Sequence, residues 1–206
     1  MIRNIVFDLG NVLISFRPSE FLETRNYPPE TRKKILSDIF GSPEWLLLDA
    51  GKISTPEAIE TIVSKSSLKR AEIERIFNER TLIFHPLDNN AKILPELKKQ
   101  GFRLYYLSNF PSDIFDEVKS SYGFFSHFEG GIISAHVKCS KPDLRIFRIF
   151  LDKFALKPEE CFYIDDTEAN VGAAISSGMK GMCTYGSPDI SGEFPIFNSF
   201  SEYIKI

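Results

Sequence analysis

Near its start the chain reads Ile5-Val6-Phe7-Asp8-Leu9-Gly10-Asn11-Val12, and this stretch decides the fold. An apolar run that leads into a carboxylate and a glycine is typical of a buried, central strand of a parallel sheet. Ligands of such sheets bind just beyond the carboxyl ends of the strands. We therefore expect Asp8 to lie at a functional site, where Gly10 lets the backbone approach a ligand closely.

The rest of the chain alternates between apolar runs and helical patterns. The expected strands are Ile2–Asp8, Phe102–Leu107, Gly131–Ser134, Cys161–Asp165 and Gly181–Tyr185. The expected helices between them are Leu87–Gln100, Asp113–Tyr122, Pro142–Phe154 and Glu168–Ser177, with Pro142 in a first helical turn. This alternation predicts an α/β fold: a Rossmann-like parallel sheet with helices on both faces.

The connection between the first two strands is too long for a single crossover. A complete strand–helix–strand unit needs about 30 residues, whereas this connection alone reaches from residue 9 to residue 101. Its helical patterns are Pro18–Arg25, Glu30–Phe40, Pro43–Asp49, Pro56–Ser64 and Lys69–Glu79, the fourth with Thr55 as its expected cap. We predict a helical cap at residues 16–84, over the carboxyl edge of the sheet, and a catalytic core of residues 1–15 and 85–206.

Composition and charge exclude several classes of function. The 206 residues carry a formal net charge of −3, which offers no basic field for nucleic acid or an anionic membrane. No apolar run reaches the length of a membrane span, and the N-terminus lacks the pattern of a secretory signal. The three cysteines form no C-x-x-C pair, as expected for reduced thiols. We expect a cytoplasmic protein that acts on a small molecule; its oligomeric state does not follow from the sequence.

Polar residues follow the carboxyl ends of four expected strands. They are Asp8 after the first, Ser108 and Asn109 after the second, Lys141 after the third, and Asp165 and Asp166 at the fourth. Carboxylates are hard oxygen ligands suited to Mg²⁺, while a hydroxyl and a lysine donate hydrogen bonds to phosphate oxygens. Each residue alone is also common in turns and helix caps. Their joint placement favours a phosphoryl-transfer site with an aspartyl nucleophile.

These motifs resemble those of the haloacid dehalogenase-like (HAD) hydrolase superfamily over the whole chain. The matching segments are Phe7-Asp8-Leu9-Gly10-Asn11-Val12, Leu107-Ser108-Asn109, Lys141-Pro142-Asp143 and Ile164-Asp165-Asp166-Thr167-Glu168-Ala169-Asn170. The form of the first motif and the turn Gly51-Lys52-Ile53-Ser54 are similar to a subgroup. That subgroup includes glucose-1-phosphate phosphatases and the phosphatase domains of soluble epoxide hydrolases.

The resemblance implies a Mg²⁺-dependent phosphatase of small phosphate esters, which we expect to be sugar phosphates. Asp8 would attack phosphorus and form an aspartyl-phosphate, with Lys141 as the second catalytic residue. Ser108, Asn109 and Lys141 would hold the phosphoryl oxygens. Mg²⁺ would be bound by Asp8, the main-chain carbonyl of Gly10 and Asp166, with Asp165 acting directly or through water.

Gly10 departs from the family pattern, because most HAD phosphatases have a second aspartate there as general acid and base. Asn11 does not replace it as a donor of similar acidity. General acid catalysis is typically worth ~10²–10⁴ in rate. We therefore expect either a preference for good leaving groups, such as anomeric sugar phosphates, or a proton donor supplied by the cap or by the substrate.

The cap offers a few candidates for contact with substrate, chosen because they lie near the hinge or near helix breaks. They are Phe16, Arg17, Trp45 and Lys52. Trp45 is more typical of cap core, and the two cations are more typical of a solvated surface, so none of them is assigned a catalytic role.

Two alternatives remain open at the level of sequence. A metal-independent 2-haloacid dehalogenase uses a similar nucleophile and lysine, but paired aspartates at positions 165 and 166 suit a cation better than a carboxylate substrate. A non-catalytic module that senses a phosphate ligand would explain Gly10 as a vestige. However, such a module has no physical need for the full set of polar residues.

Overall fold

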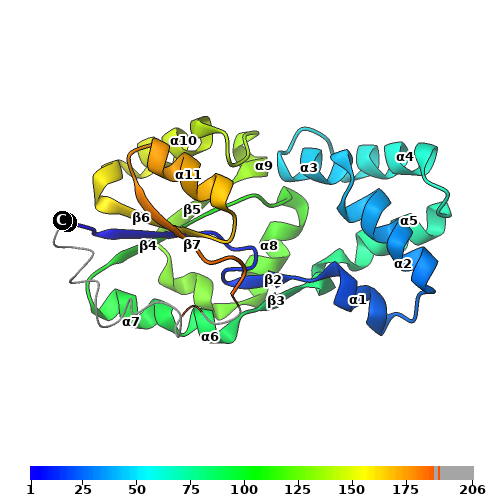
Figure 1. The fold of residues 1–206 in the computed structure, drawn as a ribbon, viewed down its shortest axis with the longest axis horizontal. Coiled ribbons are helices and arrows are strands. Elements are labelled where there is room, and N and C mark those ends of the chain that lie inside the picture. The colour runs from blue at the N-terminus through cyan, green and yellow to red at the C-terminus, as the bar shows by residue number, and fades with distance from the viewer. Residues whose placement is uncertain (188–189, 191–206) are drawn as a thin grey trace.

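The computed structural model describes residues 1–187 and 190. Its central sheet has five strands in the order β5-β4-β1-β6-β7, and all neighbouring pairs are parallel (Figure 1). The strands are β1 (Asn4–Phe7), β4 (Arg103–Ser108), β5 (Gly130–Ile133), β6 (Cys161–Asp165) and β7 (Lys180–Cys183). The predicted α/β fold is confirmed, and the strand before Asp8 is the central one.

Helices cover both faces of this sheet. They are α6 (Asp88–Ala91), α7 (Ile93–Lys99), α8 (Ser112–Ser121), η3 (Gly123–His127), α9 (Ser134–Val137), α10 (Leu144–Phe154), η4 (Pro158–Glu160) and α11 (Glu168–Ser176). Because side chains alternate along a strand, Ile5 and Phe7 pack in the cluster that includes α7 and α8, whereas Val6 packs in the cluster with α10 and α11. All four residues of β1 are buried, as expected for a strand covered on both faces.

The register of the sheet brings the predicted site residues together. Phe7 at the end of β1 pairs with Tyr106 of β4 and with Ile164 of β6. The next residue along each of the two strands β1 and β6 is an aspartate, so Asp8 and Asp165 leave the sheet side by side. The carboxyl ends of these strands therefore form one edge that carries polar groups.

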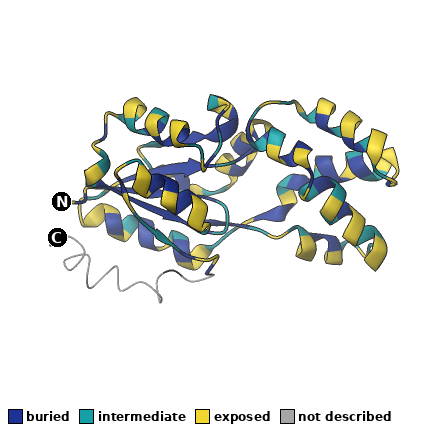
Figure 2. Ribbon diagram, turned by 45° about the horizontal axis from the view of Figure 1, so that its top comes forward, coloured by how far each residue is buried: buried dark blue, intermediate teal, exposed yellow. Residues whose placement is uncertain are grey.

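A helical insertion, residues 17–83, lies between two short antiparallel strands, β2 (Ile14–Phe16) and β3 (Phe84–Pro86). Its elements are α1 (Pro18–Thr24), α2 (Pro29–Ile35), η1 (Leu36–Phe40), α3 (Pro43–Asp49), α4 (Thr55–Lys65), α5 (Arg70–Glu79) and η2 (Arg80–Ile83). Figure 1 shows it extending from the carboxyl edge of the sheet. Its buried residues face inward between its helices, and exposed residues cover its outside (Figure 2).

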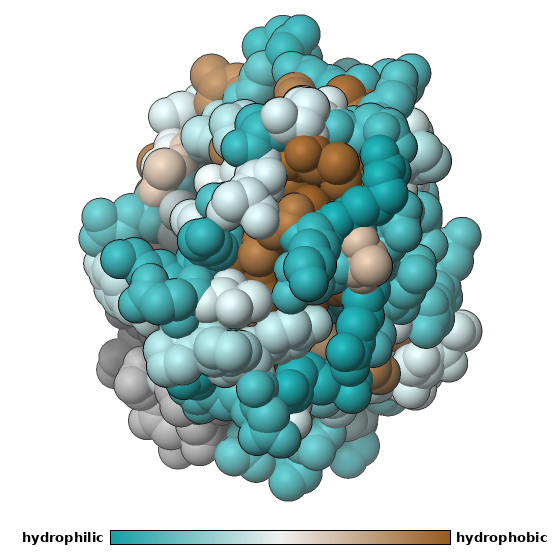
Figure 3. All heavy atoms as spheres, turned by 90° about the vertical axis from the view of Figure 1, so that its right-hand side faces the viewer, coloured by the Kyte–Doolittle hydropathy of each residue, from teal (hydrophilic) through white to brown (hydrophobic). Residues whose placement is uncertain are grey.

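The face that the insertion turns away from the sheet is largely hydrophilic, with a small hydrophobic area near its middle (Figure 3). Across the described residues, no helix is both long enough and apolar enough to cross a lipid bilayer.

Several element boundaries differ from those expected. The helix expected from Pro142 begins at Leu144, because Asp143 is its N-cap and its side chain accepts a hydrogen bond from the Arg145 N–H. The fourth helix of the insertion is capped by Ser54 rather than Thr55. Ser54 and Glu57 form a reciprocal capping box, which satisfies two free N–H groups.

Two of the expected helices are each divided in two, and the last strand is shorter than expected. The helix expected over 30–40 is an α-helix followed by a π-helix, and the helix expected over 87–100 is divided between α6 and α7. The last strand spans Lys180–Cys183 instead of reaching Tyr185, which has a positive φ of 51°.

Candidate active site

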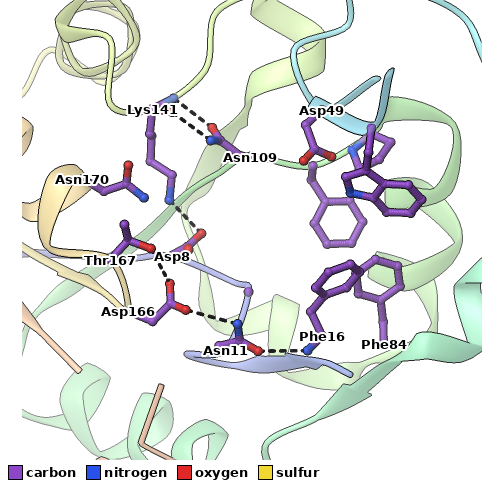
Figure 4. Close-up of a pocket in the computed structure, with 14 residues that line it drawn as sticks. Asp8, Asn11, Phe16, Asp49, Phe84, Asn109, Lys141, Asp166, Thr167 and Asn170 are labelled. Carbon is purple, nitrogen blue, oxygen red and sulfur yellow. Dashed lines mark hydrogen bonds and ion pairs between the residues drawn. The ribbon is translucent and has the colours of Figure 1, made fainter. Parts of the chain in front are cut away.

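A cavity of about 240 Å³ lies where the helical insertion meets the carboxyl edge of the sheet (Figure 4). Its lining residues are Asp8, Gly10, Asn11, Phe16, Trp45, Asp49, Phe84, Asn109, Phe110, Pro111, Lys141, Asp166, Thr167 and Asn170. Five of the seven residues predicted to act in catalysis, phosphate binding or metal binding are among them: Asp8, Gly10, Asn109, Lys141 and Asp166. Ser108 and Asp165 are buried at the ends of their strands, behind this lining.

Lys141 connects two carboxylates at the base of the cavity. Its Nζ lies 2.9 Å from Asp8 Oδ1 and 2.6 Å from Asp165 Oδ2, and it donates a hydrogen bond of 2.8 Å to the hydroxyl of Tyr163. Burial alone would lower the pKa of Lys141, but the two carboxylates raise it. Lys141 is therefore a fixed positive charge in direct contact with Asp8.

The backbone of Lys141 is held by Asn109, which follows the neighbouring strand. The Asn109 amide donates to the Lys141 carbonyl at 3.0 Å and accepts from the Lys141 N–H at 2.9 Å. These paired hydrogen bonds fix the loop after α9 against the loop after β4. Asn109 thus positions Lys141, a function that its place in the sequence did not predict.

Asp165 is engaged on both carboxylate oxygens. Oδ1 accepts hydrogen bonds from the Thr167 N–H at 2.8 Å and from Asn170 Nδ2 at 3.0 Å, while Oδ2 accepts from Lys141 and from the Tyr163 hydroxyl. Burial raises the pKa of Asp165, but the Lys141 charge and these hydrogen bonds outweigh it and lower the pKa. Asp165 is thus an ionised residue that orients Lys141 and Asn170.

Asp8, Asp165 and Asp166 could together hold a metal ion, since each offers a carboxylate oxygen and these atoms lie within 4.8 Å of one another. Asp166 accepts a hydrogen bond of 3.1 Å from the side chain of Asn11, whose own oxygen accepts from the Phe16 N–H. Burial raises the pKa of Asp8 to about 7, although Lys141 opposes this shift. A divalent cation beside these oxygens would lower that pKa and stabilise the ionised carboxylate of Asp8.

Aromatic rings form the wall opposite the polar base. Phe16 at the end of β2 contacts Trp45 of α3 and Phe84 of β3, with ring centroids 5.9 and 5.5 Å apart, and Phe84 contacts Phe110 at 4.8 Å. Of the four cap residues expected to contact substrate, Phe16 and Trp45 line the cavity. Arg17 and Lys52 are exposed and absent from its lining.

Asp49, the last residue of α3, adds a carboxylate to this wall. In the sequence it is only the polar end of a helix before the break at Ala50-Gly51, so its place in the cavity was not predicted. The signal available was its position two residues before a glycine at a turn of the insertion. Burial raises the pKa of Asp49 to about 7, and the negative charge of Asp8 contributes to the same shift.

Known proteins resemble this chain in sequence or in fold. The sequence is 29% identical to a sesquiterpene phosphatase of Aspergillus oryzae, over 86% of this chain and 87% of the relative. It is 24% identical to a phosphorylated carbohydrates phosphatase of Thermotoga maritima, over 85% of this chain and 82% of the relative. A HAD family enzyme of Bacteroides thetaiotaomicron, solved with magnesium and inorganic phosphate, superposes with a TM-score of 0.73. It is 22% identical and covers 94% of this chain and all of its own.

A sequence profile of the haloacid dehalogenase-like hydrolases matches residues 2–178. The match includes the four motifs on which the resemblance rested, as well as the whole helical insertion. The chain belongs to the haloacid dehalogenase-like hydrolase family.

Proposed function

We propose that the protein is a Mg²⁺-dependent phosphatase of small phosphate esters that works through an aspartyl-phosphate on Asp8. The observation that carries this proposal is the base of the cavity. There, a buried carboxylate, a lysine 2.9 Å away and a second aspartate, Asp166, face the same space. The likeness to two phosphatases over most of the chain supports it.

The residues at the bottom of the cavity have separate roles in phosphoryl transfer. Asp8 is the nucleophile, and Lys141 holds a phosphoryl oxygen with its fixed positive charge. Ser108, whose hydroxyl donates a hydrogen bond to Asp8, is a second donor to the phosphate. Asn109 keeps Lys141 in place and presents its amide at the cavity surface.

The donor set fits Mg²⁺, since carboxylate oxygens are its preferred protein ligands. Asp8, Asp166 and the main-chain carbonyl of Gly10 would hold it. Asp165 would act through water, because both of its oxygens already accept hydrogen bonds from the protein. When bound, the cation neutralises negative charge on the phosphate and on the carboxylates. The solved enzyme that binds magnesium and phosphate supports this assignment.

We further propose that the helical insertion acts as a cap that excludes water from this site and that the protein works in the cytoplasm. The cap assignment is supported by the cavity, because Trp45 and Asp49 of the insertion line it together with residues of the sheet edge.

Two classes of substrate are candidates. Sugar phosphates, which the sequence favours, are supported by the likeness to a phosphatase of phosphorylated carbohydrates. Esters of an apolar alcohol are the second class, and the specific observation that favours them is the aromatic wall of Phe16, Trp45, Phe84 and Phe110. Apolar ligand surface that is buried against such rings contributes about 25 cal/mol of favourable free energy per Å². The likeness to a sesquiterpene phosphatase agrees with this class.

Release of inorganic phosphate by metal-stripped protein tests the function. The assay compares p-nitrophenyl phosphate, glucose 1-phosphate, glucose 6-phosphate and farnesyl phosphate, with and without Mg²⁺, for wild type and Asp8→Asn. We expect release that requires both Mg²⁺ and Asp8. Faster turnover of glucose 1-phosphate than of glucose 6-phosphate would support a need for good leaving groups. Faster turnover of farnesyl phosphate than of either sugar ester would favour the apolar class.

The same assay separates the alternatives. Halide release from a 2-haloacid in the presence of EDTA, without phosphatase activity, would establish the dehalogenase. No turnover by wild type, together with normal binding of a phosphate ester by Asp8→Asn, would establish the sensing module.

A further inference from the structure

When Asp8 attacks an alkyl phosphate, the departing alkoxide is a poor leaving group unless its oxygen receives a proton. This inference rests on the proposed function. Among the residues that line the cavity, the titratable groups are Asp8, Asp49, Lys141 and Asp166. Asp8 is the proposed nucleophile and Asp166 a proposed metal ligand, while Lys141 is held by two carboxylates. Asp49 is the remaining acid, on the wall opposite the nucleophile.

The backbone of Asp49 is fixed to the core. Ser134, which follows β5, donates its hydroxyl proton to the carbonyl of Asp49, and the same hydroxyl accepts a hydrogen bond of 3.0 Å from the Phe110 N–H. Phe110 follows Asn109 directly, so Asp49 is tied to the loop that positions Lys141.

A second contact holds the end of α3 in the same place. Gly51 has a φ of +62°, and a Cβ built on it would lie 2.3 Å from the carbonyl oxygen of Ala135. Only glycine allows the two backbones to approach this closely. The insertion is therefore docked on the core within two residues of Asp49.

The side chain of Asp49 projects into the cavity, toward the side on which Asp8 and Asn109 lie (Figure 4). In the part of the chain that the structure describes, its carboxylate takes part in no hydrogen bond or ion pair. An unengaged carboxyl group that faces the substrate space is available to exchange a proton with the substrate. Burial raises the pKa of this carboxyl to about 7, so its protonated form is present near neutral pH.

We propose that Asp49 is the general acid and base of this enzyme, in place of a side chain that Gly10 lacks. In the first step an oxygen of Asp8 bonds to phosphorus as the bond from phosphorus to the leaving oxygen breaks, and Asp49 gives its proton to that oxygen. In the second step Asp49 takes a proton from water as the water oxygen attacks phosphorus and the bond to Asp8 breaks. The products are the alcohol, inorganic phosphate and the original protonation state of Asp49.

The test compares wild type with Asp49→Asn, which keeps the size of the side chain but removes its acidity. Turnover is measured with p-nitrophenyl phosphate, whose leaving group needs no proton, and with glycerol 1-phosphate, whose leaving group does. Rapid mixing with p-nitrophenyl phosphate also measures the burst of p-nitrophenolate and the phosphate retained on the protein. Glu30→Gln is the matched control, since Glu30 is exposed on α2 and lies outside the cavity.

We expect Asp49→Asn to lose about 10²–10⁴-fold in turnover of glycerol 1-phosphate. With p-nitrophenyl phosphate the burst should remain near one equivalent per site at an almost unchanged rate, and phosphorylated protein should accumulate because the water step lacks its base. Glu30→Gln should behave as wild type in every assay.

Equal losses on both esters, with no accumulation of phosphorylated protein, would overturn the assignment and leave Asp49 a structural residue of the cap. So would full activity of Asp49→Asn on glycerol 1-phosphate. Those outcomes leave the phosphatase itself intact. Absence of phosphate release by wild type, or its persistence in Asp8→Asn, would instead remove the proposed function and this assignment with it.

Discussion

At the scale of single residues, Lys141 is a buried cation whose neighbours are two buried carboxylates. Removing one partner of a buried ion pair costs about 3–5 kcal/mol, because an uncompensated charge stays in the interior. We expect Lys141→Met to abolish turnover and to lower the free energy of unfolding by about that amount at pH 8. At pH 5 the loss should be smaller, because in the variant Asp8 and Asp165, without the Lys141 charge beside them, take up protons. Urea unfolding at both pH values measures this, with exposed Lys119→Met as the control; equal losses at both would contradict it.

If the sheet edge supplied the proton donor, that donor would stand at position 10, where this chain has a glycine. The nearest atom to a Cβ built there is Asp8 Oδ2 at 4.0 Å, so a larger side chain fits. In an Asp49→Asn background, we expect Gly10→Asp to raise turnover of glycerol 1-phosphate at least about tenfold, as part of the ~10²–10⁴ that general acid catalysis supplies. Gly10→Asn in the same background tests whether acidity is the cause. If both substitutions restore turnover equally, a changed backbone rather than a proton donor is responsible.

At the scale of elements, the parallel sheet and most of the cavity base could be predicted because both depend on local pattern. Apolar runs identify the strands. Asp8 follows its run directly, and Lys141 lies beyond α9 in the connection after β5. β2 and β3 were missed because three residues are too few to establish a period. Asp49 was missed for a different reason, because its place in the cavity depends on where α3 docks. The sequence of Pro43–Asp49 does not indicate that α3 packs against Ser134 and Ala135.

The docking of α3 is itself open to test. Gly51→Ala would place a methyl group against the Ala135 backbone, at a φ of +62° that disfavours side chains. We expect the helix end to shift and turnover of alkyl esters to fall by about 10²-fold, as a misplacement near 1 Å can cost. Gly101→Ala is the matched control, because Gly101 also has a positive φ, +91°, but no atom lies within 4 Å of its Cβ. A similar loss of turnover in both variants would assign the effect to strain alone.

At the scale of the whole molecule, the site is formed jointly by the edge of the sheet and the helical insertion. The sheet edge supplies the carboxylates and Lys141, and the insertion supplies Asp49 and Trp45. Phe16 and Phe84 lie on the two short strands that flank the insertion. The position of Asp49 has an electrostatic cost, because burial, and after it the negative charge of Asp8, raises the pKa of Asp49 to about 7. The closed arrangement of cap and core should therefore depend on pH.

The sign of this dependence follows from the pKa of Asp49, which folding raises from 3.8 to about 7. At about pH 3 and below, the carboxyl is protonated in both states and contributes almost nothing. Between pH 4 and 7 the folded state binds the extra proton, so stability falls as pH rises, and above pH 7 the full cost is present. Without Mg²⁺, Asp49→Asn should therefore be more stable than wild type by on the order of 1–3 kcal/mol at pH 8.

At about pH 3 that difference should nearly vanish, since Asp49 is then protonated in both the folded and the unfolded protein. Urea unfolding of the two proteins at both pH values measures it, with Glu30→Gln expected to match wild type throughout. A difference that stays constant with pH would mean that Asp49 is not the group whose ionisation opposes closure. In that case its carboxylate would be as well solvated in the folded chain as in the unfolded one.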